Sequence, residues 1–409
     1  MIKTVRDAWK IPELRNKILF TIFALLIFRL GAAIPVPYIN GAQLETYLTA
    51  QSGTILGLMN AMSGSAFSMA TLFALSVQPY INSSIIIQLL TVAIPALERL
   101  ARDGGEEGKK KIQSITRYAT VAIAILQAVG YYFMMKNYNL LGQEGIWPAL
   151  VIIVTLIAGS SFVMWMGEQV TEFGVGNGIS IILFAGILSR IPNMVSGMVD
   201  GVQKWSAIKA GTMTLESLTS AGYTEAQAQA YLNGALAPWA IVLLVVGMLA
   251  LIAFIVFIND AERRIPVQYA KRQVGRKMYG GQSSTLPMKV NMSGVLPIIF
   301  AQSIAMIPST IAAFCKQPAE GTFWYGFLNA IDTKSVLYMI FYFLMIIAFS
   351  YFYATIQFNP VEIANNLKKQ GGFIPGFRPG QPTVQFIQKV LSRITLFGAI
   401  YLGIVAICP

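Results

Sequence analysis

The segment NDAERRIPVQYAKRQVGRKMYGGQSSTLPMKVN, residues 259–291, lies between two apolar stretches and is too long for a simple turn. Its charges are two anions, Asp260 and Glu262, against the cations Arg263, Arg264, Lys271, Arg272, Arg276, Lys277 and Lys289. One interpretation is a topology signal, because Lys and Arg in short loops hold those loops in the cytoplasm. Topology does not require a polar, glycine-containing hairpin around the charges, however. The segment therefore also fits a basic docking surface.

The composition is that of a protein with many membrane spans. Of the 409 residues, 55% are hydrophobic and 12% are charged, whereas soluble domains are about a quarter charged. A spanning helix needs about 20 mostly apolar residues. The apolar stretches predict nine spans: 18–38, 66–98, 118–136, 147–166, 178–199, 237–258, 292–314, 336–357 and 391–408.

The distribution of charge predicts the orientation of these spans. The first span follows a cationic segment and is too long for a signal peptide, so we expect a cytoplasmic N-terminus. Alternation from there places 23 of the 30 Lys and Arg residues on the inner side, as the positive-inside rule requires. The net charge of +12 then belongs mostly to the cytoplasmic face. Such a face suits anionic lipids, nucleic acid or an acidic protein partner.

Several kinds of chemistry are disfavoured. The chain has no histidine, and it lacks the common motifs for nucleotide binding, zinc binding and nucleophilic catalysis. We therefore expect no enzyme activity, no cofactor and no metal site. Its two cysteines, Cys315 and Cys408, fall at the outer ends of predicted spans, where thiols more often stay free. The spans contain almost no ionisable residues near the bilayer midplane. Arg29, near the outer end of the first span, is the exception, and we expect it to pin that helix end or a neighbouring carbonyl.

The spans contain proline residues and neutral polar side chains. Pro79 and Pro297 are predicted to interrupt the second and seventh spans, either as ordinary kinks or as breaks around a pathway. The polar side chains suit helix contacts that hold yet can part, with modest hydrogen bonds of roughly 0.6–2 kcal/mol each. They are Asn82, Ser83, Ser84, Gln88, Thr91, Gln127, Gln302 and Ser303.

Apolar residues at helical spacing accompany these polar groups. Ile81 and Ile85 share one helix face, and so do Leu183 and Ile187. A ring of such residues can close a pore by excluding water. Periodicity alone would assign them to ordinary core packing.

Six segments together resemble the SecY/Sec61 family of protein-conducting channels. They are FRLGAAIPVPYI (28–39), SVQPYINSSIIIQLLTV (76–92), GEQVTEFGVGNGISIILFAGI (167–187), the run from ERRIPVQY to IIFAQS (262–303), FNPVEIANNLKKQGGFIPGFRPGQPT (358–383) and VLSRITLFGAIYLG (390–403). They occur in family order and cover nearly the whole chain. The resemblance implies an all-α membrane bundle whose two pseudo-symmetric halves surround a central pore.

The resemblance also implies roles for individual residues. The pore ring would comprise Ile81, Ile85, Ile187 and Ile299, with Leu183 on the same face as Ile187. Residues 57–70 match the plug, a short helix that blocks the outer funnel, and include Asn60, Met62, Ser63, Gly64 and Phe67. The polar residues of the lateral gate would be Gln88, Thr91, Gln127 and Gln302. Docking of the SecA motor or the ribosome would involve Arg263, Arg264, Lys271, Arg272, Arg276, Lys277 and Arg378.

The implied organisation is an N-terminal half, 1–199, an outer loop, 200–235, and a C-terminal half, 236–409. Family members have ten spans, so the tenth is missing from this sequence. The implied partners are SecE, SecG, SecA, the ribosome, signal-bearing polypeptides and anionic lipids, in a bacterial cytoplasmic membrane. The rival interpretations are a secondary transporter, which the lack of midplane charges disfavours, and a membrane-embedded enzyme, for which no nucleophile and base pair is found.

Overall fold

The computed structural model describes residues 9–41, 43–44, 60, 63–102, 104–211, 214, 229, 232, 234–269, 272–274, 277–279, 283–292, 294–314 and 335–407. Two compact units make up the chain. The first comprises Met1–Gly197 with Met306–Ser335, and the second Met198–Ala305 with Val336–Pro409. The predicted halves 1–199 and 236–409, and the outer loop 200–235, stay a prediction.

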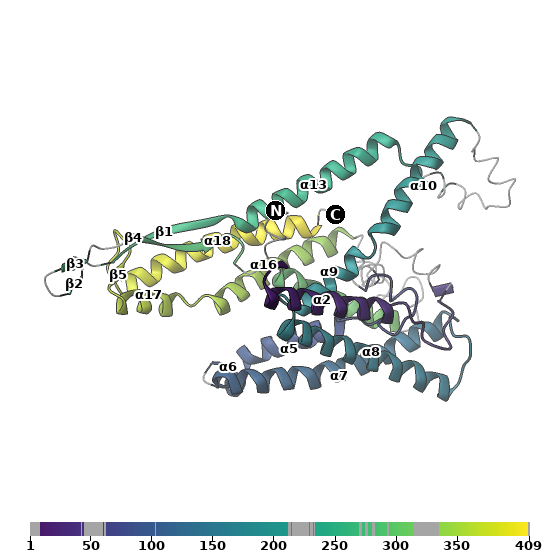
Figure 1. Cartoon of the computed structure of the whole chain (residues 1–409), viewed down its shortest axis with the longest axis horizontal. Coiled ribbons are helices and arrows are strands. Elements are labelled where there is room, and N and C mark those ends of the chain that lie inside the picture. The colour runs from purple at the N-terminus through teal and green to yellow at the C-terminus, as the bar shows by residue number, and fades with distance from the viewer. Residues whose placement is uncertain are drawn as a thin grey trace. The chain divides into compact units, whose positions relative to one another are not determined.

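Long helices form most of the first unit (Figure 1). They are α2 (Pro12–Gly31), α5 (Gln78–Ala93), α6 (Pro95–Arg102), α7 (Gly105–Asn137), α8 (Ile146–Phe173), α9 (Gly178–Leu188) and α10 (Ile191–Lys209), which continues into the second unit. Helix α7 packs against both α5 and α8, and α8 also packs against α2 and α9. One core joins the inner faces of α7 and α8 to residues 67–75, through Tyr131, Met134, Ile152 and Leu156.

Two side-chain hydrogen bonds tie elements of this unit together. The buried Ser83 hydroxyl on α5 donates to the Thr116 carbonyl on α7 at 2.8 Å. The Thr21 hydroxyl on α2 accepts from the Val175 amide, in the turn after α8, at 3.2 Å. The Thr116 carbonyl, inside α7, also accepts from the Thr120 hydroxyl at 2.7 Å, whereas the Val175 amide lies beyond the end of α8, where the helix offers it no partner.

Neither predicted proline break occurs as expected. Pro79 lies in the first turn of α5, and Pro297 is the second residue of α14 (Leu296–Phe314). Proline suits this position because its missing N–H would have no helical partner there and its φ angle is already helical. The bend falls further along, between α5 and α6, where the axes turn by 106°.

The predicted inner loop between the second and third spans is largely helical. Helix α6 and the first turns of α7 occupy most of residues 95–117, and α6 is amphipathic, with sequence PALERLAR. Gly108 allows α6 to approach α7 closely, because a Cβ there would overlap the Leu100 carbonyl oxygen. The cations of this region therefore lie on ordered helices.

The described helices confirm a helical membrane protein, while the number of spans stays a prediction. Six helical stretches are long and apolar enough to cross a membrane, and the bent pair α5–α6 would make a seventh. In the described part of the chain, α2 and the described apolar part of α14, Leu296–Ala305, do not meet the same test. The six include α7, α8 and α13 (Pro238–Asp260).

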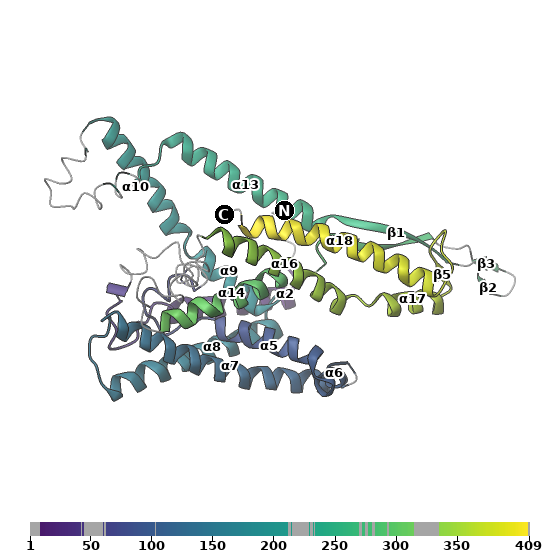
Figure 2. The same cartoon turned by 180° about the vertical axis from the view of Figure 1, so that it is seen from behind.

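The second unit combines membrane helices with a small antiparallel sheet (Figures 1 and 2). Its helices are α13, the first part of α14, α16 (Val336–Gln357), α17 (Pro360–Lys369) and α18 (Gln381–Ile407). Its strands are β1 (Glu262–Tyr269), β2 (Arg272–Val274), β3 (Lys277–Tyr279), β4 (Ser283–Lys289) and β5 (Gly372–Phe373). Strands β4, β1 and β5 form one sheet in that order.

Strands β1 and β4 confirm the hairpin expected in residues 259–291. Their register pairs Glu262 with Lys289 and Gln268 with Ser283. Side chains of β1 alternate, with Ile265 and Val267 buried, as expected for a strand that covers a core with one face. At the base of the hairpin, the Asn291 side-chain amide nitrogen donates to the Asn259 side-chain oxygen at 2.9 Å.

Candidate channel and docking sites

Residues 57–70, which we call the plug match, overlap a buried segment of irregular backbone, residues 63–77. Apart from a single bridge residue, Thr71, residues 63–77 are hydrogen-bonded turns, so the expected short helix is wrong for residues 63–70, whereas Asn60 is helical. Gly64, Ser65, Ala70 and Ser76 have positive φ angles, from 47° to 71°. A helix cannot contain such residues, because the left-handed region reverses the local turn. Most side chains of this segment are nevertheless buried.

The expected plug residues hold the segment's own turns together. The Ser63 hydroxyl donates to the Asn60 carbonyl and accepts from the Phe67 amide, both at 3.1 Å. The Asn60 side-chain oxygen accepts from the Ser68 amide at 3.0 Å. Phe67 is 2% exposed, and Met62 lies outside the described residues. Small polar side chains thus stand in for the missing helix ladder.

Backbone hydrogen bonds join this segment to the stretch after α2. The Val36 amide donates to the Ala70 carbonyl at 2.8 Å, and the Leu72 amide donates to the Ile34 carbonyl at 2.9 Å. Gly159 allows α8 to approach the backbone of this segment closely, because a Cβ at position 159 would overlap the Leu72 carbonyl oxygen.

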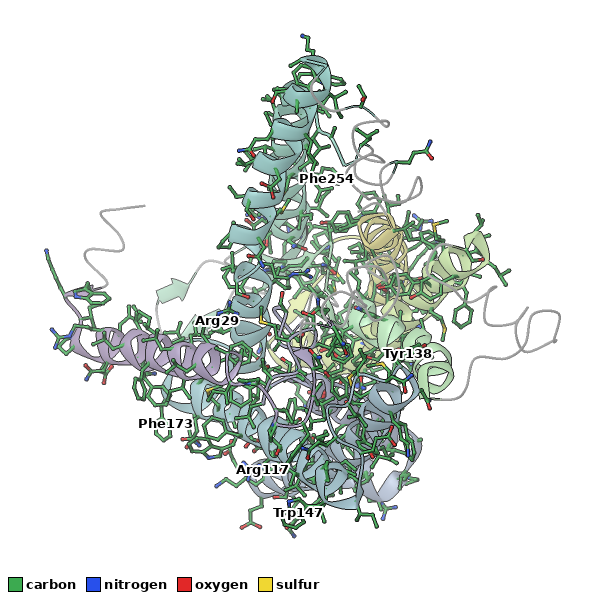
Figure 3. All side chains as sticks on the ribbon, turned by 90° about the vertical axis from the view of Figure 1, so that its right-hand side faces the viewer. Arg29, Arg117, Tyr138, Trp147, Phe173 and Phe254 are labelled. Atoms are coloured by element: carbon green, nitrogen blue, oxygen red, sulfur yellow. The ribbon has the colours of Figure 1, made fainter. Side chains whose placement is uncertain are left out.

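Arg29 lies in the last turn of α2, and Figure 3 labels it. Its guanidinium donates to the Gly64 carbonyl at 3.5 Å. The expectation that Arg29 pins a neighbouring carbonyl is therefore confirmed. The carbonyl belongs to the plug match, so this contact joins α2 to that segment.

The expected pore-ring residues differ in exposure. Ile81 and Ile85 on α5 are 6% and 4% exposed, whereas Ile187 on α9 is 57% exposed. Leu183 on α9 and Ile299 on α14 are partly buried. Four of these five residues belong to the first unit and Ile299 to the second, and their assignment to a ring stays a prediction.

The expected gate residues also differ in exposure and in hydrogen bonding. Gln88 is exposed, and the Thr91 hydroxyl donates to its carbonyl within the same helix at 2.7 Å. Gln127 on α7 has a buried side-chain oxygen for which the described atoms provide no hydrogen-bond partner. Gln302 is partly buried on α14. The side-chain bond that joins α5 to α7 comes instead from Ser83.

The hairpin of segment 259–291 and the segment 358–380, which contains Arg378, form one module. We call it the stalk and define it as β1, β4, α17, β5 and the residues 374–380 that follow β5. The end of β1 pairs with β5, Gln268 opposite Phe373 and Tyr269 opposite Gly372. One core beneath these strands contains Ile265, Val267 and Met288 from the hairpin, Leu367 and Ile374 from the second loop, and Ile387, Val390 and Leu391 from α18. Segments 259–291 and 358–380 thus share a single core with α18.

The stalk exposes the expected docking cations that can be described. Arg263 and Arg264 are exposed on β1, and Arg264 forms an ion pair with Glu262 at 2.6 Å. Arg378 is exposed, and its carbonyl accepts from the Thr383 hydroxyl at the start of α18 at 2.8 Å. Arg272 and Lys277 lie in the short strands β2 and β3. Lys271 and Arg276 lie outside the described residues.

The sequence did not predict the contacts of two residues of α7, Arg117 and Tyr131. Arg117, expected as a loop cation, lies on α7 and forms an ion pair with Glu168 of α8 at 2.9 Å (Figure 3). The Tyr131 hydroxyl donates to the Phe67 carbonyl of the plug match. A distant carboxylate or carbonyl partner leaves no local pattern, so neither contact had a sequence signal.

Comparisons with known proteins agree with this description. The profile of the SecY family matches residues 71–409. Protein translocase subunit SecY of Streptomyces scabiei is 38% identical over 421 residues, which cover all of this chain and 89% of that protein. A solved structure of a protein conducting channel has a TM-score of 0.60 at 17% identity, covering 98% of this chain and 89% of that one. Sec61 in a canine ribosome–channel complex from the endoplasmic reticulum has a TM-score of 0.58 at 17% identity, covering 98% and 88%.

The chain shares its fold with these structures, and the family profile and the curated relatives named protein translocase subunit SecY place it in the class of protein-conducting membrane channels. The full-length match to curated relatives narrows the class to one family. The chain belongs to the SecY family.

Proposed function

We propose that this channel moves unfolded secretory polypeptides across the bacterial cytoplasmic membrane and releases transmembrane segments sideways into lipid. The observation that carries the proposal is the irregular segment 63–77, buried among the helices of the first unit. Non-helical backbone at membrane depth is tolerated only where protein covers it or where it borders a water-filled cavity. Irregular backbone inside a helical membrane unit therefore indicates a functional role for this segment.

The segment suits a plug. It consists mostly of small residues, with Gly64, Ala66 and Ala70 among them, and its turns are held by single hydrogen bonds rather than by a helix ladder. Such an element can leave its place without melting a helix. In this proposal it closes the pathway at rest and moves aside for a polypeptide.

Residues that the family resemblance assigns to the pore and the gate would complete the channel. Ile81, Ile85, Leu183, Ile187 and Ile299 would form the constriction, which excludes water and ions yet deforms around a chain. Gln88, Thr91, Gln127 and Gln302 would lie at the lateral gate. The unpartnered oxygen of Gln127 supports this role, because a buried polar atom without a partner weakens a helix contact.

The stalk would bind the partner that supplies energy. Its exposed cations would attract the phosphates of ribosomal RNA or acidic surfaces of the SecA motor. Because the two loops share one core, a partner would meet a single preformed surface. The chain would perform no covalent chemistry of its own.

Other features support membrane partners. Ile258 is the only buried residue of helix α13 (Pro238–Asp260) in the described structure, so the rest of this helix would face lipid or a small subunit such as SecE or SecG. Cations of the predicted inner face would attract anionic lipids. The N-terminus would lie in the cytoplasm.

The decisive experiment measures ion conductance of the purified channel in planar bilayers. Deleting residues 60–68 should raise the resting conductance, because the pathway would lose its plug. Conductance equal to that of the intact channel would refute the assignment.

A second experiment addresses docking. Arg378→Glu should lower motor-driven export of a preprotein into reconstituted vesicles while membrane insertion stays normal. The matched control is Lys209→Glu, the same charge reversal on the predicted outer side, where Lys209 contacts the Trp205 ring at 5.0 Å. Equal export by both variants would contradict the docking role of Arg378.

A further inference from the structure

Tyr131 is a fully enclosed residue that joins α7 to the plug match. It is 2% exposed, and its hydroxyl donates to the Phe67 carbonyl at 3.0 Å. Its ring also meets the Phe67 ring edge-on, with centroids 5.0 Å apart. A hydroxyl buried this deeply is retained where it has a partner, because desolvation without one is costly.

We infer that Tyr131 is a positioning residue that keeps the segment 63–77 seated at rest. The inference rests on the proposed plug role of that segment. The contact goes to a main-chain carbonyl, so it does not depend on which side chains the segment carries. The same carbonyl also accepts from the Ala70 amide at 3.3 Å, and the tyrosine therefore stabilises the turn that contains it.

The backbone conformation of segment 63–77 is unfavourable by itself, so contacts with neighbouring helices are needed to hold the segment in place. Ser65, Ala70 and Ser76 all have positive φ angles, which are unfavourable for residues other than glycine. This conformation persists only where surrounding contacts compensate for it. Tyr131 supplies one from α7, and Arg29 supplies another from α2 through the Gly64 carbonyl.

Removal of the tyrosine hydroxyl separates this role from ordinary packing. Tyr131→Phe keeps the ring and its contact with Phe67 but removes the donor. The net value of one hydrogen bond predicts an increase of about two- to twelve-fold in the ratio of unseated to seated channels. The resting ion leak of the channel, reconstituted in lipid vesicles with its partner subunits, should rise by a similar factor.

The control is Tyr118→Phe, the same chemical change on the same helix at a side chain 78% exposed. Its leak should equal that of the intact channel. The distinguishing measurement repeats Tyr131→Phe in a chain that lacks residues 60–68. There it should add nothing, because the carbonyl that it served is gone.

Three results would overturn the inference. Tyr131→Phe could leave the leak unchanged while the deletion raises it, which would refute the positioning role alone. It could raise the leak equally in the deleted chain, which would place its action elsewhere. The deletion itself could leave the leak unchanged, and then the proposed plug role would fail together with the inference.

A second variant covers the case in which Tyr131→Phe cannot be purified. Arg29→Gln removes the contact to the Gly64 carbonyl from the opposite helix. It should also raise the leak in the full chain and add nothing in the deleted one. A leak unchanged in the full chain would contradict seating by backbone carbonyls.

Discussion

Gly159 offers a direct test of how α8 positions the segment 63–77. A Cβ at this position would overlap the Leu72 carbonyl oxygen and lie 2.9 Å from the carbonyl carbon. Real Cβ atoms essentially never approach other heavy atoms within 3.0 Å. Since the obstacle is backbone rather than the end of a flexible side chain, Gly159→Ala must displace residue 72 or the helix.

Two opposing energies decide the size of the effect. Overpacking a close-packed site costs about 1–3 kcal/mol, and displacement of Leu72 also endangers the 2.9 Å bond from its amide to Ile34, worth about 1 kcal/mol. Alanine gains about 1 kcal/mol over glycine in helix propensity. The sum favours net destabilisation by about 1–3 kcal/mol.

Gly247→Ala on α13 is the matched control, because nothing lies within 4 Å of a Cβ there. It isolates the gain in helix propensity within an apolar helix. Thermal unfolding in detergent should therefore place the midpoint of Gly159→Ala below that of Gly247→Ala, and the resting leak should rise only for Gly159→Ala. Identical midpoints and leaks for the two variants would refute the close approach of α8 to residue 72.

Three further predictions address separate contacts. Thr21→Val removes the acceptor for the Val175 amide and should lower stability by about 1 kcal/mol in detergent unfolding, whereas unchanged stability would show that the bond contributes nothing. Gln268→Cys with Phe373→Cys, directly opposite on β1 and β5, should form a disulfide under mild oxidation when the two natural cysteines are replaced. Failure to cross-link while each single variant folds would argue against the pairing of β1 with β5 in the stalk. Asn359→Ala removes the side chain that accepts from two amides at the start of α17 and should cost about 1 kcal/mol. Hydrogen exchange in α17 should then accelerate, and exchange at the original rate would contradict this capping role.

Properties that depend on local composition were predicted well. Membrane class follows from apolar stretches of sufficient length, and the hairpin of residues 259–291 follows from a polar, glycine-containing segment between two of them. The carbonyl contact of Arg29 was also foreseen. A cation near the end of an apolar helix must find an acceptor, because an unpaired charge there is costly.

Predictions that depend on where a helix begins were less successful. Pro79 and Pro297 were taken to interrupt spans, yet both lie in first turns. The sequence alone does not distinguish a proline that breaks a helix from one that begins it, because proline lacks an N–H at either place. For Pro79 the answer depends on the path of residues 63–77. Three residues that are not glycine, Ser65, Ala70 and Ser76, have positive φ angles on that path, which the sequence does not indicate.

The sequence by itself determined the membrane class, the family and the cationic character of segment 259–291, because hydrophobicity and charge act through composition over tens of residues. Tertiary structure alone decided that this segment shares a sheet and a core with residues 358–390. It also decided that Tyr131 meets the Phe67 carbonyl. These pairs lie about a hundred and 64 residues apart, and main-chain groups are the same at every position. Contacts of this kind therefore become visible only when packing brings the two segments together.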